Sequence, residues 1–313
     1  AAAIGTVSYP EMKRYGYYPR LSTGSIAAGG TLGFLIPPSI GFIVYGMLTE
    51  QSIGKLLIAG IIPGILLTGA YILVVILMIR FSPQLAPRRL EGVSWRGKLQ
   101  ALYGVWEPLA VFIVVIGGIY SGIFTPTEAG AVGATILFLV ALCKRKLGRK
   151  ELITALYNTV RISVMVLLLV AGANVFSYFL ALTTIPMRAA AWAAALQVSP
   201  YTILVIFILM YLVLGCFLDA ISMMVLTMPV IYPVVLELGF HPIWFGVIAV
   251  LMMEAGLITP PMGLNIYTVA GVAEGVKVET IFRGVMPFLF SIFAVVLLIC
   301  LFPALAMFLP NAM

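Results

Sequence analysis

The chain has 313 residues, of which 63% are hydrophobic and only 9% are charged, and its formal net charge is +7. An average soluble domain has roughly 25% charged residues, so this composition excludes an ordinary water-soluble protein and indicates one embedded in a lipid bilayer. The positive charge does not indicate a nucleic-acid partner, because many of the cations are concentrated between apolar segments.

The N-terminal segment reads as the end of a helix followed by a loop. It begins "AAAIGTVSYPEMKRYGYYPR" (1–20), with no initiator methionine and without the basic, apolar and small-residue pattern of a signal peptide. We therefore expect this sequence to be truncated, with an N-terminal part of the protein preceding it. A site to which that part contributes would be incomplete here.

Long apolar runs follow this segment. A helix needs about 20 apolar residues to cross about 30 Å of hydrocarbon, and several of the runs reach that length. The period-2 alternation of a membrane β-barrel is not visible in them. The sequence therefore predicts an all-α integral membrane protein, with helices over 56–79, 109–124, 129–143, 162–182, 201–218, 243–253 and 285–309.

Two loops between these runs carry many of the basic residues, as is typical of cytoplasmic loops. The runs 109–124 and 129–143 cross the membrane once in each direction between them, so both loops are predicted to lie on one side. The first loop also holds Trp95 and is followed by Trp106, which predicts an interfacial arm anchored at lipid headgroups. The basic residues are Arg80, Arg88, Arg89, Arg96 and Lys98 in the first loop, and Lys144, Arg145, Lys146, Arg149 and Lys150 in the second.

Three acidic residues lie within or beside the apolar runs, where an ionised group is costly and usually faces a partner or a cavity. Glu128, in "TPTE", reads as part of the first turn of a capped helix. Asp219 is the only aspartate in the chain. It either neutralises a bound cation, with Ser222 as a neighbouring hydroxyl, or caps the next helix. For Glu254, a coupling site and a buried hydrogen-bonded acid predict the same sequence.

A pair of consecutive prolines interrupts the apolar sequence twice, in "GFLIPPSIGFIVYGM" (33–47) and in "GLITPPMGLNIYTVA" (256–270). In each stretch a glycine precedes the pair by four residues. A short, mostly apolar segment containing a tyrosine follows, and a polar turn then leads into a longer run. This shared order indicates two related halves, but it does not tell whether the repeat is inverted.

Two consecutive prolines break a helix inside the membrane. Each lacks an N–H donor and clashes with the carbonyl one turn earlier, and an unpaired backbone group in hydrocarbon costs on the order of several kcal/mol. A simple kink is the alternative reading of one proline, but a doublet in both halves favours a site. The freed carbonyls are suited to a hard cation such as sodium, and nearby side-chain oxygens would come from Thr31, Ser39, Thr259 and Asn265.

Four motifs resemble one family of membrane transporters. They look like the large membrane subunit of tripartite ATP-independent periplasmic (TRAP) transporters, and the resemblance extends over essentially the whole chain. In that family a serine- and glycine-rich stretch usually precedes the "AAAIG" of residues 1–5, and a polar residue is expected where this chain has Met252. The motifs are "GTLGFLIPPSI" (30–40), "GIYSGIFTPTEAGAVGA" (118–134), "GCFLDAISMMVLTMPVIYPVV" (215–235) and "EAGLITPPMGLNIYTVAGVA" (254–273).

The resemblance implies a multi-pass secondary transporter of the bacterial inner membrane, which moves an organic acid of the sialic acid or C4-dicarboxylate type inward with sodium. It implies an elevator-type transport domain with two re-entrant helical hairpins. The implied partners are a small membrane subunit and a periplasmic substrate-binding protein, with sodium as the coupling ion and no organic cofactor. Membrane lipids are further partners, and Arg188 and Arg283 read as facing lipid headgroups.

Carried onto this chain, the resemblance implies where sodium and substrate bind. The substrate would lie between the hairpin tips, lined by Ser22, Thr23, Ser25 and Asn265. Sodium is the only metal expected, and no catalytic residue is expected. The sodium ligands would come from Gly30, Thr31, Gly33, Pro37, Pro38, Ser39, Asp219, Gly256, Thr259, Pro260, Pro261 and Gly263.

The expected domain organisation follows the same family. Residues 1–50 belong to the transport domain, with its first hairpin and broken helix, and residues 183–275 form the second hairpin and broken helix. Residues 51–150 form scaffold and arm helices, residues 151–182 form a scaffold helix, and residues 276–313 form a C-terminal membrane helix.

Other functions use some of the same features. An ion channel can use broken helices and carbonyl oxygens, and a proton-coupled carrier is the other alternative to sodium symport. A membrane enzyme needs a nucleophile with a base, or a metal cluster, but the single histidine, His241, lies beside a proline in an expected loop. A structural scaffold would not need costly helix breaks in both halves. The sequence therefore favours a transporter.

Overall fold

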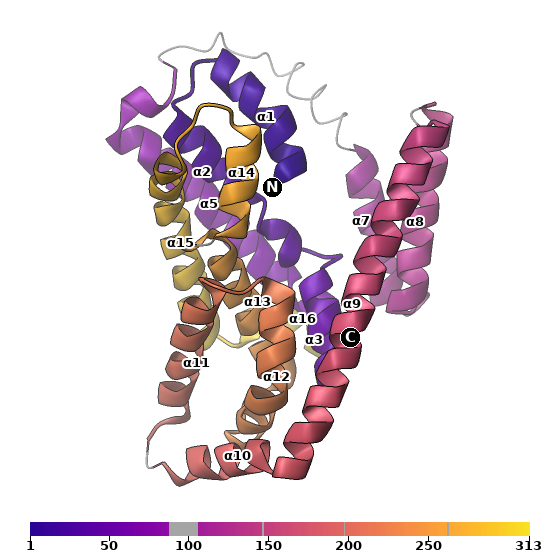
Figure 1. Cartoon of the computed structure of the whole chain (residues 1–313), viewed down its shortest axis with the longest axis vertical. Coiled ribbons are helices and arrows are strands. Elements are labelled where there is room, and N and C mark those ends of the chain that lie inside the picture. The colour runs from indigo at the N-terminus through magenta and orange to yellow at the C-terminus, as the bar shows by residue number, and fades with distance from the viewer. Residues whose placement is uncertain (88–105, 146, 197, 262) are drawn as a thin grey trace.

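The computed structural model describes residues 1–313 except 88–105, 146, 197 and 262 (Figure 1). All regular elements in this described part are helices, which confirms the all-α prediction. Five of the described helical segments are long and apolar enough to span a membrane, so the chain is a multi-pass membrane protein. These are Ile53–Phe81, Pro126–Cys143, Arg149–Thr183, Ala220–Glu237 and Val278–Leu301.

The first part of the chain contains the first proline pair between short helices. Pro19 occupies the first turn of its helix, where its missing N–H is not needed. The run expected over 56–79 begins earlier and is divided at Gly60 into two helices. The elements are α1 (Ala2–Arg14), α2 (Pro19–Gly29), η1 (Leu32–Phe34), α3 (Ile40–Thr49), α4 (Ile53–Ala59), α5 (Ile61–Phe81) and η2 (Pro83–Leu85).

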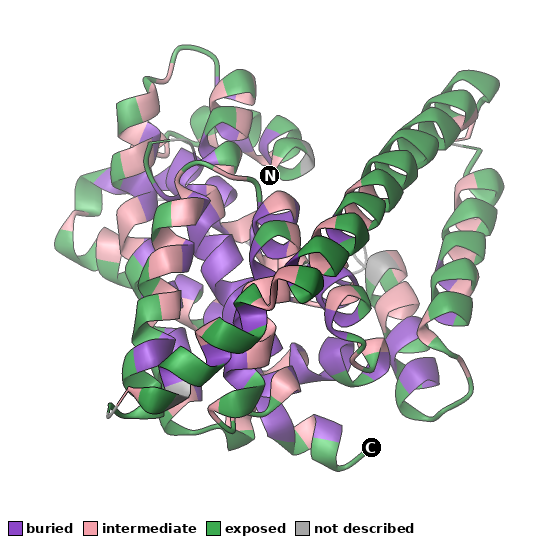
Figure 2. Ribbon diagram, turned by 60° about the horizontal axis from the view of Figure 1, so that its bottom comes forward, coloured by how far each residue is buried: buried purple, intermediate pink, exposed green. Residues whose placement is uncertain are grey.

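The middle part forms a helical arm that projects from the rest of the chain (Figures 1 and 2). Helices α7 (Trp106–Tyr120) and α8 (Pro126–Cys143) pack side by side in opposite directions, as the two expected crossings require. Lys144, after α8, pairs with Glu107 on α7. Helix α9 (Arg149–Thr183) starts well before the expected run 162–182. The predicted basic and interfacial residues Arg88, Arg89, Trp95, Arg96, Lys98 and Lys146 lie outside the described residues.

The structural role predicted for Glu128 is confirmed at the start of α8. Its Oε2 accepts a hydrogen bond from the backbone N–H of Thr125 at 2.8 Å, and Thr125 Oγ1 accepts one from the Glu128 N–H at 3.3 Å. This reciprocal pair is a capping box, which satisfies two backbone donors that a helix start otherwise leaves unpaired.

The last part contains the second proline pair. The run 285–309, expected as one helix, is divided because a helix tends to end before a proline and Pro303 follows α15. The elements are α10 (Ile185–Ala195), α11 (Pro200–Gly215), α12 (Ala220–Glu237), α13 (Pro242–Ile258), α14 (Leu264–Val272), α15 (Val278–Leu301) and α16 (Ala304–Asn311).

Helix α13 lies at the centre of the core. Nearly all of its residues are buried, and it packs against α11, α12 and α15 and against helices of the first part. Helix α9 differs, because Ala173 and Leu180 are the residues that it buries (Figure 2). The packing also crosses between the two parts: α1 contacts α14, and α12 contacts α3. The segments around both proline pairs are therefore held by helices from the other part of the chain.

Candidate functional site

The first break lies between α2 and α3. A backbone carbonyl normally accepts a hydrogen bond from the N–H three or four residues later, but those positions are Pro37 and Pro38 for the carbonyl of Phe34. The hydroxyl of Ser39 donates to that carbonyl instead. Ser39 Oγ also accepts from the N–H of Phe42 at 3.3 Å and so caps α3. The predicted sodium ligand Ser39 is thus buried and already bonded to its own backbone.

The other residues predicted at the first break lie in different surroundings. Thr31 is fully buried, its Oγ1 donates to the carbonyl of Ala28 at 2.8 Å, and it lies 3.2 Å from the hydroxyl of Tyr71 on α5. Gly30 packs against the N-terminal residue, because a Cβ on it would lie 2.7 Å from the Cα of Ala1. Gly33 is exposed, and a Cβ there would meet nothing within 4 Å.

The second break follows α13. Here Pro260 and Pro261 occupy the two positions that would donate to the carbonyl of Leu257, which accepts no hydrogen bond within the described part of the chain. Thr259 Oγ1 donates to the carbonyl of Ala255 at 2.6 Å, and the carbonyl of Thr259 accepts from the N–H of Gly263 at 3.1 Å. The peptide bond between the two prolines is cis, as it is in the first pair.

Asp219 lies in the turn that joins α11 to α12. Its Oδ2 accepts hydrogen bonds from the N–H groups of Ile221 and Ser222, both at 3.1 Å, so the predicted helix cap is confirmed. The side chain is exposed, and its Oδ1 takes no part in these bonds. A cap uses one carboxylate oxygen, so the same residue retains an oxygen for a cation.

A hollow of about 320 Å³ joins the α11–α12 turn to the second break. Three predicted sodium residues, Asp219, Gly256 and Gly263, line this hollow together. It also contains residues that the sequence analysis did not select, and their signal was weak. Gly215 was only one letter of a longer motif, and Leu257 has an apolar side chain although its carbonyl is the atom of interest. The additional lining residues are Gly215, Phe217, Leu218, Leu257, Leu264 and Tyr267.

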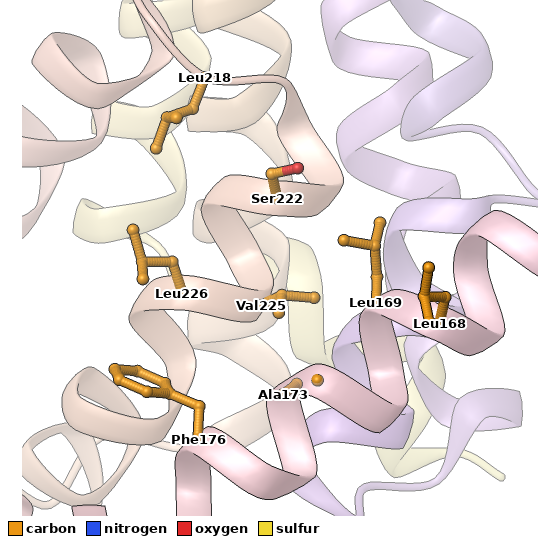
Figure 3. Close-up of a pocket in the computed structure, with 9 residues that line it drawn as sticks. Leu168, Leu169, Ala173, Phe176, Leu218, Ser222, Val225 and Leu226 are labelled. Carbon is orange, nitrogen blue, oxygen red and sulfur yellow. The ribbon is translucent and has the colours of Figure 1, made fainter.

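A second hollow of about 320 Å³ adjoins the turn, between α9 and α12 (Figure 3). Leu169, Ala173 and other apolar residues of α9 face α12, and Ser222 supplies the polar side chain of this lining. Leu218 lines both hollows. Residues in and beside the turn with Asp219 therefore line two hollows.

The predicted substrate residues do not line the hollow beside Asp219. Ser22 and Thr23 are fully buried, and their hydroxyls donate to the carbonyls of Tyr18 and Pro19 within α2 and its cap. Ser25 lines another hollow, beside Tyr71 and Phe288. Asn265 Nδ2 donates to the carbonyl of Ala27 at 3.3 Å, and so ties α14 to α2. Short hydroxyl side chains on a helix bond readily to the carbonyl one turn earlier, which removes them from an open surface.

Glu254 is fully buried in α13, and neither carboxylate oxygen has a hydrogen-bonding partner among the described residues. Thr31 and Tyr71 are its polar neighbours. Since Thr31 lies at the first break and Glu254 precedes the second, the two breaks approach each other here. The sequence contained no signal for the third member, Tyr71.

Comparisons with known proteins identify the family. Residues 1–305 match the family described as "Tripartite ATP-independent periplasmic transporter, DctM component". The chain is 35% identical to the "C4-dicarboxylate TRAP transporter large permease protein DctM" of Pseudomonas aeruginosa, over 99% of this chain and 72% of that protein. It is 32% identical to the "Sialic acid TRAP transporter large permease protein SiaM" of Vibrio cholerae, over the same shares of the two chains.

Another relative has a longer chain. It is the "Isethionate TRAP transporter permease protein DctMQ" of Oleidesulfovibrio alaskensis, which is 33% identical over 98% of this chain but only 48% of that protein. These relatives are transporter components and not enzymes. The broken helices, the turn with Asp219 and the comparisons agree, and the chain belongs to the DctM component family of tripartite ATP-independent periplasmic transporters.

Proposed function

We propose that this protein is the large permease subunit of a sodium-coupled TRAP transporter, which carries an organic acid across the bacterial inner membrane. The observation that carries the proposal is the hollow between the α11–α12 turn and the second break, lined by Asp219, Gly256 and Gly263. An acidic residue and closely packed glycines line it, together with Leu257, the residue whose backbone carbonyl the prolines leave free. The oxygens of this set are suited to a small hard cation, and the adjoining space is suited to the organic anion that is transported with it.

The sodium ligands that the geometry supports best are the free oxygen of Asp219 and the carbonyl of Leu257. That carbonyl has no backbone donor within the described part of the chain, because prolines occupy both positions that would normally supply one. The corresponding carbonyl at the first break, that of Phe34, is occupied by Ser39. Sodium at the first break would therefore displace the Ser39 hydroxyl or use Gly30, Thr31 and Gly33.

Two related halves with inverted topology are part of the proposal. The contacts of α1 with α14 and of α3 with α12 support this proposal. A twofold axis that relates the two halves would interchange these two contacts. The α11–α12 pair supports a re-entrant hairpin (Figure 1). Helix α11 has 16 residues, and at 1.5 Å per residue it is about 24 Å long, shorter than the roughly 30 Å of a hydrocarbon core.

We further propose an elevator mechanism, in which one part of the protein moves against a fixed scaffold. Residues 1–50 and 183–275 would form the moving part, residues 51–150 and 151–182 the scaffold, and residues 276–313 the C-terminal helix. The hollow between α9 and α12 supports this division, because loosely packed apolar surfaces slide more easily than interlocked ones (Figure 3). The exposed apolar side chains of α9 are also suited to lipid or to a small membrane subunit.

The substrate and the partners are inferred from the relatives. Their names specify C4-dicarboxylates and sialic acid, which are both organic acids, and a fused protein combines two permease parts. We therefore propose an organic acid of the C4-dicarboxylate or sialic acid type as substrate. A small membrane subunit and a periplasmic substrate-binding protein complete the proposed assembly.

The test is uptake of radiolabelled C4-dicarboxylates and sialic acid into proteoliposomes containing the full-length permease, its small subunit and its periplasmic protein. Uptake should require an inward sodium gradient and should fall at least tenfold in Asp219→Ala, since that change removes a charged ligand (about 1.5 kcal/mol or more). Thr135→Ala is the control, because the Thr135 hydroxyl on α8 donates to the carbonyl of Ala131 in its own helix.

The outcome separates the alternatives. Uptake driven by a proton gradient and indifferent to sodium, in protein shown to be folded, would replace sodium symport with a proton-coupled carrier. Flux that does not saturate and shows no ion coupling would indicate a channel. Either result would remove the sodium role of Asp219 and of the Leu257 carbonyl.

A further inference from the structure

Arg20, in the first turn of α2, satisfies a backbone carbonyl on another helix. Its Nε donates to the carbonyl of Arg283 on α15 at 3.3 Å. In an unbroken helix this carbonyl would accept from the N–H four residues later, but that residue is Pro287, which has no N–H. The contact therefore compensates for the proline and fixes the direction of the Arg20 side chain.

This contact uses only one of the guanidinium's five N–H donors. The ion pairs within the described residues join other side chains, Arg14 with Glu11 and Lys144 with Glu107. Neither Arg20 nor Arg283 has an acidic partner there. The Nη groups of Arg20 are consequently held in a defined place with their charge uncompensated by described protein groups, which suits the binding of an anion.

The same arginine lines a hollow of about 300 Å³ beside α5 and α15. Pro287 forms part of its wall, and most of the rest is apolar side chains from the last turns of α5, including Val74, Leu77 and Phe81. Helix α5 is part of a candidate membrane span and ends at Phe81, with Ser82 next. The groove thus runs along the end of a span and is apolar on one side and cationic at Arg20.

We propose that this groove binds a phospholipid with an anionic headgroup. The Nη groups of Arg20 would hold the phosphate, and the first part of an acyl chain would lie along Val74, Leu77 and Phe81. The two features match the two parts of one lipid molecule, and a bilayer places such molecules at the end of a span. This inference goes beyond the proposed transport function and does not depend on which substrate is carried.

The experiment measures phosphatidylglycerol bound to the full-length protein by native mass spectrometry, after removal of bulk lipid and titration with this one species. Arg20→Gln keeps an N–H donor toward the carbonyl of Arg283 but removes the charge. It should weaken the tightest phosphatidylglycerol site roughly tenfold, the effect of losing one charge-assisted contact. Arg80→Gln is the matched control, because Arg80 is an exposed cation in the last turn of α5, whose residues form the groove wall, and does not itself line the groove.

A second variant tests the apolar half of the site with the charge intact. Leu77→Trp should fill the groove and also weaken phosphatidylglycerol binding, while leaving Arg20 in place. Unchanged affinity in both Arg20→Gln and Leu77→Trp would overturn the proposal. Equal affinity of the unmodified protein for phosphatidylcholine would also overturn it. Displacement of the lipid by soluble glycerol phosphate at equal concentration would overturn it too, because it would show that the site binds the headgroup alone and does not use the groove. Matching circular dichroism and melting temperatures establish that each variant is folded.

Discussion

Gly215 and Gly256 bring α11 and α13 into direct backbone contact beside the hollow that contains Asp219. A Cβ on Gly215 would lie 2.6 Å from the Cα of Gly256, and one on Gly256 would lie 2.8 Å from the Cα of Gly215. These distances leave no room for a side chain on either residue. The contact positions the hairpin turn against the second break, so the geometry of the proposed site depends on both glycines.

Alanine at either position should therefore separate the two helices. We expect Gly215→Ala and Gly256→Ala each to lower the free energy of unfolding by about 1–3 kcal/mol, the usual cost of overpacking. Unfolding in mixed detergent micelles measures this. Gly130→Ala on α8 is the control, because a Cβ there meets nothing within 4 Å, and alanine in a helix is favourable by about 1 kcal/mol. Equal stability of all three variants would contradict the close contact.

Asp219 combines a helix cap with a proposed ion ligand, and two substitutions separate these roles. Asparagine can accept the same hydrogen bonds from Ile221 and Ser222, so Asp219→Asn should leave stability nearly unchanged. Asp219→Ala should cost about 0.5–2 kcal/mol, the usual effect of losing a cap. Both variants remove the charge, and both should raise the sodium concentration needed for half-maximal uptake. Normal sodium dependence in Asp219→Asn would assign this residue to capping alone.

The sequence predicted much of the fold because helix-forming runs and helix breaks are local properties. The structural effect of a long apolar run, of a proline doublet or of the "TPTE" cap depends mainly on residues that are close together in the sequence. Helix ends were predicted less well, as at Gly60 and Pro303, where one residue divides an apolar run whose composition does not change. Composition reports burial in lipid, whereas the division depends on backbone hydrogen bonding.

The site was predicted only in part because its members come together through tertiary packing. Asp219, Gly256 and Gly263, which come from separate motifs, line one hollow, whereas Ser22 and Thr23 bond to their own helix or its cap. The sequence does not distinguish a serine or threonine whose hydroxyl bonds to its own helix from one whose hydroxyl faces a cavity. Tyr71 and the carbonyl of Leu257 could not be selected, since the first is distant in the chain and the second belongs to an apolar residue.

Thr31 and Tyr71 form a buried hydroxyl pair beside Glu254, with 3.2 Å between the two oxygens. Thr31 donates to the carbonyl of Ala28, so Tyr71 must donate to Thr31. We expect Tyr71→Phe to cost about 0.5–1.5 kcal/mol, the net value of one such bond. A double-mutant cycle with Thr31→Val should give a coupling of about 0.5 kcal/mol or more. Tyr211→Phe, which removes another buried hydroxyl pair, with Thr227, should show no coupling to Thr31.

His241 gives the fold a dependence on pH at the start of α13. Its Nδ1 accepts a hydrogen bond from the N–H of Ile243 at 3.2 Å, which requires that nitrogen to be unprotonated. Burial, and then the positive charge of Lys55, lower the pKa of His241 below its ordinary value of 6.5. The unfolded chain therefore binds a proton more readily than the folded protein does. The contribution of His241 to the free energy of unfolding is fully present above about pH 6.5, and it is lost as the pH falls below that value and through the lower pKa of the folded protein.

The side chain of His241 is exposed, so screening by solvent should keep this loss of stability small. Melting temperatures of the protein and of His241→Asn, measured from pH 8 to pH 5, test the prediction. Asparagine can cap the helix but does not titrate, so the variant should lose less stability on acidification than the unmodified protein. Parallel curves for the two proteins would show that other groups cause the acid dependence, and a steeper loss in the variant would reverse the predicted sign.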